Sequence, residues 1–279
     1  MSEYKDKIDK TVWSYSRIGT FNSCPYSFYL QYLLDKDVRN KQYPPEDNFY
    51  AELGGYVHEI LEMIFKGELS IDDAPMYYME HYNENVKTKV KKSIMDKKYE
   101  ACADYFAEVD FGWLKSFDIL GVELKINTEI EGYKFIGYID LLLRDKSDGD
   151  IVLLDHKSAK YPLGKKGQIL SASKNGFESY KHQMYLYCKA VEEMYGEFPK
   201  KIVWNHFADG GRFMSIPFKA EEYEDALNWF VEQIRMIEKE EEFAPKIDFF
   251  ACSQLCNFRK SCEYRPKYEP WKNKKKNKK

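Results

Sequence analysis

The chain has 279 residues, of which 44% are hydrophobic and 32% charged, and its formal net charge is −3. This length suits one large domain or a core with an inserted subdomain. No apolar run approaches the roughly 18 residues that a membrane helix needs, and the net charge argues against a uniformly basic DNA-coating protein. Because no charged-then-apolar leader begins the chain, we expect it in the cytoplasm, or in the host cytoplasm if it is viral.

Helices and strands are predicted in turn along the chain. The expected helices span residues 16–34, 57–65, 75–95, 99–113, 177–195 and 221–242. The expected strands span residues 123–131, 133–144, 150–158, 200–207 and 212–218. Residues 1–13 are predicted as a loose arm and 36–48 as a loop, with Ser14 or Ser16 capping the first helix. This order indicates an α/β fold with a mixed sheet, flanking helices and a helical insertion before the sheet.

Two short runs that contain charged residues each lie at the end of an apolar stretch in an expected strand. Gly137-Tyr138-Ile139-Asp140 is one, and Asp155-His156-Lys157 is the other. Lys146-Ser147-Asp148-Gly149 between them predicts a tight turn, because Asp-Gly supplies the positive φ angles that a hairpin needs. One register of this hairpin puts Asp140 opposite Asp155, and the other puts it opposite Lys157. In both registers the three side chains share one face.

Two opposed carboxylates on a half-buried sheet repel each other unless a cation lies between them. A divalent metal fills that role, and oxygen ligands suit Mg²⁺ or Mn²⁺. The alternative is a surface hairpin whose polar residues face water.

Cysteines supply a second candidate metal site. Three of the six have C-x3-C-x5-C spacing, which is typical of metal ligands rather than disulfides: Cys252, Cys256 and Cys262. Three thiolates leave a tetrahedral site one ligand short, and Cys24, more than 220 residues earlier, is the expected fourth. Cys102 and Cys188 lie in helical segments and are expected to be small buried residues. Four cysteines alone suit zinc as readily as iron–sulfur.

Asp140 and Asp155-His156-Lys157 together resemble the motif of the PD-(D/E)XK nuclease superfamily. The run from Ser14 to Phe28 around Cys24-Pro25, with the cysteine triplet, is similar to the iron–sulfur branch of the RecB-type nucleases, which includes AddB-type helicase subunits and CRISPR adaptation nucleases. The resemblance implies a restriction-endonuclease-like core and a [4Fe–4S] cluster on the four cysteines that joins the N- and C-terminal segments. Zinc is the alternative, because the first gap of the triplet is one residue longer than usual.

Further marks of that family occur in the expected order. They imply metal ligation by His58, Asp140, Asp155, the backbone carbonyl of His156 and Glu123. They imply catalytic roles for Asp140, Asp155, Lys157, Gln183 and Tyr187. Gln183 and Tyr187 match Q-x-x-x-Y and share one helix face. The ordinary readings are a partly buried histidine for His58, a solvated residue for Glu123 and an amphipathic core helix for Gln183 and Tyr187.

The resemblance implies a Mg²⁺- or Mn²⁺-dependent DNA nuclease, in particular an exonuclease on DNA ends or single strands. Recombination, repair, phage replication and CRISPR adaptation are the processes it suggests. Its implied partners are DNA, further copies of the chain, and recombination or CRISPR proteins, without a membrane. The alternative is a non-catalytic DNA-binding or assembly module that keeps the fold and cluster.

We expect five parts along the chain. They are an N-terminal arm and helix with the first cluster cysteine at 1–50, a helical subdomain at 51–118, the nuclease core at 119–245, the cysteine triplet at 246–265 and a basic tail at 266–279. The segment from Arg259 to Lys279 contains ten Lys and Arg residues but only two Glu residues. The tail is expected to be disordered, and it either touches phosphates or only improves solubility.

Overall fold

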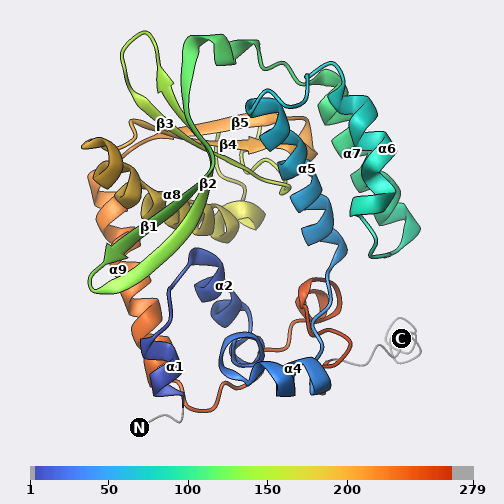
Figure 1. Cartoon of the computed structure of the whole chain (residues 1–279), viewed down its shortest axis with the longest axis vertical. Helices are drawn as coiled ribbons and strands as arrows, with labels where there is room; N and C mark the ends of the chain where they lie inside the picture. The colour runs from blue at the N-terminus through green and yellow to red at the C-terminus, as the bar shows by residue number, and fades with distance from the viewer. Residues whose placement is uncertain (1–3, 266–279) are drawn as a thin grey trace.

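In the computed structural model, which describes residues 4–265, a five-stranded sheet in the order β1-β2-β3-β4-β5 lies between two layers of helices (Figure 1). The strands are β1 Phe117–Ile130, β2 Tyr133–Asp145, β3 Ile151–His156, β4 Lys201–His206 and β5 Arg212–Pro217. The first three form an antiparallel meander, β4 is parallel to β3, and β5 is antiparallel to β4. The predicted mixed α/β fold is therefore confirmed.

Helices cover both faces of the sheet. The longer ones are α2 Tyr15–Ser23, α5 Phe49–Phe65, α6 Ala74–Asn85, α7 Lys92–Glu108, α8 Lys174–Tyr195 and α9 Ala220–Lys239. The shorter ones are α1 Lys5–Asp9, α3 Pro25–Phe28, η1 Tyr29–Leu33, α4 Lys36–Gln42, η2 Gly112–Ser116, η3 Ser171–Ser173, η4 Phe207–Asp209 and η5 Ala251–Leu255. Among residues 4–265 no helix combines the length and apolar character needed to cross a membrane.

Strand β3 is buried along its whole length because both of its faces are covered. Leu153 belongs to the apolar core formed with α8 and α9, whereas Leu154 belongs to the core formed with α5, α6 and α7. Side chains alternate across a strand, so a strand between two layers is a continuous apolar run rather than an alternating one. The same burial encloses the polar residues at its end, Asp155 and His156, which are 3% and 4% exposed.

The expected helix over residues 16–34 is broken at Cys24. Ser14 caps α2 as expected and accepts a hydrogen bond from the N–H of Arg17 at 3.2 Å, but Cys24 is extended, with φ −163° and ψ 108°. The next residue, Pro25, lacks an N–H and disfavours helical backbone in the residue before it. Cys24 therefore lies in a bend between α2 and α3, outside regular helix.

Three other expectations at the N-terminal side were wrong. The arm is docked, because Trp13 donates its N–H to the Lys134 carbonyl at 2.8 Å and its side chain is buried. The expected loop at 36–48 contains α4, whose first N–H groups are capped by Asp35. The expected helix at 75–95 is interrupted at 86–91, where Thr88 donates its N–H to Glu52 at 2.7 Å. The expected tail at 266–279 lies outside the described residues, and the five-part division stays a prediction.

Gly137 on β2 provides a test of the packing between the sheet and α8. A Cβ there would lie 2.5 Å from Cε1 of Tyr187, whereas a Cβ on Gly54 in α5 would have no neighbour within 4 Å. We expect Gly137→Ala to lower the free energy of unfolding by about 1–3 kcal/mol through overpacking. Gly54→Ala should raise it by about 0.5–1 kcal/mol, because alanine favours helix. Equal shifts of the two melting temperatures would contradict this packing.

Candidate active site

The β2–β3 hairpin adopts the register in which the two aspartates are opposed. Leu141 pairs with Leu154, so Asp140 and Asp155 are the next residues along the two strands. The N–H of His156 donates a hydrogen bond to Oδ2 of Asp140 at 2.6 Å. Of the two registers that the sequence allowed, the structure has the one that brings the carboxylates together.

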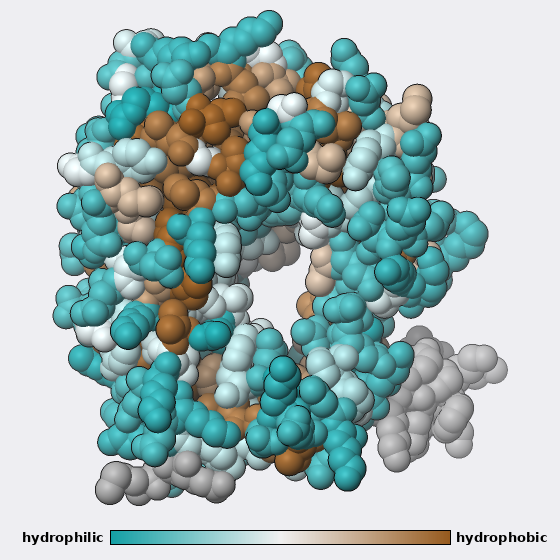
Figure 2. Space-filling model, in the orientation of Figure 1, coloured by the Kyte–Doolittle hydropathy of each residue, from teal (hydrophilic) through white to brown (hydrophobic). Residues whose placement is uncertain are grey.

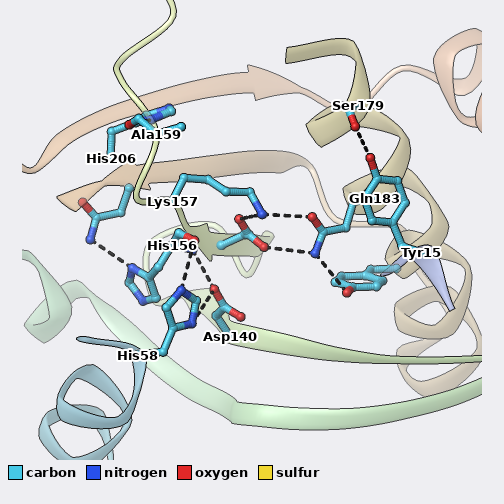
Figure 3. A network of polar contacts seen from close by, with 12 residues as sticks. Tyr15, His58, Asp140, His156, Lys157, Ala159, Ser179, Gln183 and His206 are labelled. Carbon is cyan, nitrogen blue, oxygen red and sulfur yellow. Dashed lines mark hydrogen bonds and ion pairs between the residues drawn. The ribbon is translucent and has the colours of Figure 1, made fainter. Parts of the chain in front are cut away.

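Lys157 joins Asp155 to α8. Its Nζ lies 2.7 Å from Oδ2 of Asp155 and donates to Oε1 of Gln183 at 2.9 Å. The Gln183 amide nitrogen donates to Oδ1 of Asp155 at 3.3 Å and to the Tyr187 hydroxyl at 3.1 Å. The end of β3 and one face of α8 thus share a closed polar network (Figure 3). The one-face expectation for Gln183 and Tyr187 is confirmed, while their catalytic roles stay predictions.

A second group of candidate ligands lies on the other side of Asp140. His58 on α5 places Nδ1 3.5 Å from Oδ2 of Asp140 and 3.7 Å from Oε1 of Glu123. Its Nε2 lies 3.2 Å from the His156 carbonyl oxygen. His58, Glu123 and Asp140 offer ligand atoms that all lie within 4.8 Å of one another. His58, Glu123, Asp140 and the His156 carbonyl therefore converge from α5 and three adjacent strands. The carboxylate of Asp155, also a predicted ligand, lies outside this group and contacts Lys157 and Gln183.

Glu123 adopts an unusual backbone conformation. Its φ is +45°, and its neighbours Val122 and Leu124 pair with Leu141 and Ile139, so Glu123 lies across from Asp140. A residue with a side chain at positive φ costs on the order of 1–3 kcal/mol, and such residues gather at functional sites. In this conformation Glu123 brings a second carboxylate close to Asp140 and His58.

The pKa values at the site are shifted because charged groups lie close together and are shielded from water. Burial and the neighbouring Asp155 raise the pKa of Asp140 to about 7, against the opposing effect of His58. Burial lowers the pKa of Lys157, but the carboxylates of Asp155 and Asp140 outweigh it and raise that pKa overall. Burial also lowers the pKa of His58, and Glu123 with both aspartates raises it overall. A cluster of carboxylate and carbonyl oxygens with one imidazole fits a bound Mg²⁺ or Mn²⁺ ion.

Three residues that support His156 and Lys157 were not predicted from the sequence. Asn205 on β4 lies 3.0 Å from Nδ1 of His156 and also contacts Tyr105, and the Lys157 ammonium lies 4.9 Å from the ring centre of Tyr180. None belongs to a short motif. A strand at residues 200–207 was expected, but its pairing with β3 cannot be read from local sequence.

The four candidate cluster cysteines are among the residues that line one cavity of about 380 Å³: Cys24, Cys252, Cys256 and Cys262. Burial raises the pKa of the Cys256 thiol, and the neighbouring Cys24 and Cys252 contribute to the same direction. The expected meeting of the two terminal segments is therefore confirmed, whereas the group that the thiols hold stays a prediction. Cys102 and Cys188 are fully buried, as expected.

With this geometry, comparison with known proteins defines the class. The family model of the PD-(D/E)XK nuclease superfamily matches residues 12–263, so the chain belongs to that superfamily. A crystal structure from Eubacterium rectale, described as "Putative exonuclease", shares the fold with a TM-score of 0.51 and 15% identity. The alignment covers 99% of this chain and 96% of that one. No curated protein sequence matches the chain.

Replacing Asp140 by asparagine tests the electrostatic origin of the site. Folding raises the pKa of Asp140 from 3.8 to about 7, because the folded protein disfavours the charged carboxylate. The folded state therefore loses stability as the pH rises from 3.8 through about 7. At pH 8 and without metal, Asp140→Asn should raise the free energy of unfolding by on the order of 1 kcal/mol. It should also abolish the thermal shift produced by Mn²⁺.

The control is Asp118→Asn, which changes an exposed carboxylate on β1. It should leave both measurements unchanged. A metal-free Asp140→Asn protein that melts lower than the unmodified chain at pH 8 would show that the two carboxylates are not in conflict.

Proposed function

We propose that the chain is a metal-dependent exonuclease that hydrolyses phosphodiester bonds at DNA ends or in single strands. The observation that carries the proposal is the convergence of Asp140, Asp155 and Lys157 beside Gln183. A nuclease needs to bind a divalent ion and to place a positive charge near the scissile phosphate, and these residues supply both. Asp140, Asp155 and Lys157 are all of the residue types that these two tasks require.

In this proposal each residue has a definite task. Asp140, Asp155, Glu123, His58 and the His156 carbonyl would hold one or two divalent ions. Bound there, a divalent ion lowers the pKa of a water and neutralises charge on the phosphate.

The neighbouring side chains prepare the attack. Lys157, held between Asp155 and Gln183, would orient the attacking water or stabilise charge that develops on the phosphate. Tyr187 holds the amide of Gln183 and so limits the directions in which Lys157 can point.

The shape of the molecule supports a preference for DNA ends. Figure 2 shows an opening through the molecule, and α2, α5 and the segment with the cysteine triplet surround it in Figure 1. The ring closes where the residues before α5 meet that segment, because the N–H of Glu46 donates to the Asn257 carbonyl at 2.7 Å and the Asn48 amide donates to the Leu255 carbonyl at 3.2 Å. A strand passing through a closed ring has to enter by an end.

We further propose that the four cysteines hold a [4Fe–4S] cluster, as in RecB/AddB-type nucleases. Zinc would draw its sulfur ligands to about 3.8 Å from one another, given Zn–S bonds of about 2.3 Å. Within the described part of the chain, no three cysteine sulfurs lie within 4.8 Å of one another. The four cysteines line one cavity of about 380 Å³, which leaves room beside them for a group larger than a single ion.

The nuclease proposal predicts metal-dependent loss of nucleotides from end-labelled single-stranded DNA. Lys157→Ala should lower turnover by about 100- to 1,000-fold while Mn²⁺ binding is retained, because Lys157 acts on the phosphate rather than on the ion. Lys160→Ala, a change of an exposed lysine three residues on, should cost little.

Circular single-stranded DNA provides the comparison for end dependence. It should resist the enzyme that degrades the linear form of the same sequence. Equal cleavage of the circle would make the protein an endonuclease. Absence of metal-dependent cleavage of either form would favour the non-catalytic DNA-binding module.

The cluster proposal is tested by iron, sulfide and zinc analysis of protein purified without oxygen. We expect about four irons per chain with matching sulfide and a broad thiolate-to-iron absorbance band. Cys256→Ser should lose most of the iron, whereas Cys188→Ala, which changes a buried cysteine on α8, should keep it. One zinc per chain in the unmodified protein would replace the cluster proposal with a zinc staple.

A further inference from the structure

We propose that Asn205 on β4 and Tyr105 on α7 are positioning residues that aim the His156 carbonyl into the metal site, so that the helical insertion sets the affinity for the ion. This inference rests on the proposed function, because the carbonyl matters only if the site binds a divalent ion. It concerns two residues that no motif of the sequence singles out.

Asn205 holds the segment after Asp155 at two points. It pairs with His156 in the parallel β3–β4 ladder, and its carbonyl accepts the N–H of Lys157 at 2.8 Å. Its side-chain nitrogen lies 3.0 Å from Nδ1 of His156. Asn205 is fully buried, so this contact is made away from water. One residue therefore fixes both the imidazole of His156 and the backbone that follows it.

The remaining freedom of His156 is removed by its other neighbours. Its N–H donates to Asp140, and its ring lies nearly parallel to the Phe65 ring, at 9° and 5.7 Å between centres. The His58 ring meets it edge-on at 5.6 Å. With the ring and the flanking N–H groups held, the carbonyl oxygen of His156 points towards His58 Nε2, at 3.2 Å. That oxygen is the one assigned to the metal.

Tyr105 completes the arrangement from the helical insertion. The Asn205 amide has two N–H groups, and the second donates to the Tyr105 hydroxyl at 2.7 Å. The Tyr105 side chain is buried and its ring packs against those of Phe106 and Phe207. Because the same amide nitrogen contacts both Tyr105 and His156, the Tyr105 hydroxyl holds the amide against the imidazole, and loss of that hydroxyl lets the amide turn away. Partners that orient a metal ligand typically change metal affinity by about 10- to 100-fold when they are removed.

A purely structural role for Tyr105 predicts a different result. In that case, loss of its hydroxyl lowers the melting temperature and leaves metal affinity unchanged. The two roles are separated by measuring Mn²⁺ binding to the full chain by calorimetry without DNA, alongside thermal melting and the KM for DNA.

For Tyr105→Phe we expect the Kd for Mn²⁺ to rise about 10-fold, with the KM for DNA unchanged at saturating Mn²⁺. Tyr82→Phe is the matched control, since Tyr82 is also buried in the insertion and its hydroxyl has no hydrogen-bond partner among the described residues. It should keep the Kd of the unmodified protein. Asn205→Ala should weaken Mn²⁺ binding at least as much, and adding Tyr105→Phe to it should cause no further loss.

An unchanged Kd for Mn²⁺ in Tyr105→Phe would overturn the positioning role while leaving the proposed nuclease intact. An additive loss in the double variant would overturn the link through Asn205. If the unmodified chain does not bind Mn²⁺, both this inference and the metal-dependent nuclease fail.

Discussion

The close approach of two buried carboxylates is the constraint on which the rest of the structure depends. The β2–β3 register opposes Asp140 and Asp155, and burial with this neighbour raises the pKa of Asp140 to about 7. Like charges with so little water persist only where cations and hydrogen-bond donors surround them. The chain supplies such groups from three directions: Lys157 after β3, His58 from α5 and Gln183 from α8. His58 and Gln183 come from helices on opposite faces of the sheet, so both helix layers have to reach the end of β3.

Burial of β3 on both faces explains how those groups meet. Helices α8 and α9 cover one face, and α5, α6 and α7 cover the other, so the end of β3 lies where both layers converge. The helical insertion belongs to the site as well as to the core, because it contributes His58 and Tyr105. The cysteine segment then joins the start of α5 to the N-terminal helices and closes the ring around the opening (Figure 2).

Local chemistry in the sequence predicted much of this arrangement. Asp-Gly at 148–149 indicated the hairpin, and Gly149 indeed has a φ of +83°. The spacing of Gln183 and Tyr187 indicated one helix face. The errors came from long-range packing or from a neglected local rule. Trp13 is ordered by pairing with β2, far along the chain, whereas the break at Cys24 follows from Pro25 and could have been predicted.

By itself, the sequence determined the order of the five strands, the polar residues at the strand ends and the metal-type spacing of the cysteines, because these depend on periodicity, turn chemistry and residue type over a few positions. Tertiary structure alone decided which hairpin register holds, that Glu123 lies at positive φ beside Asp140, and that Asn205 supports His156. These outcomes depend on which faces are buried against which helices. Burial is a property of the whole packed chain, and no local run of residues specifies it.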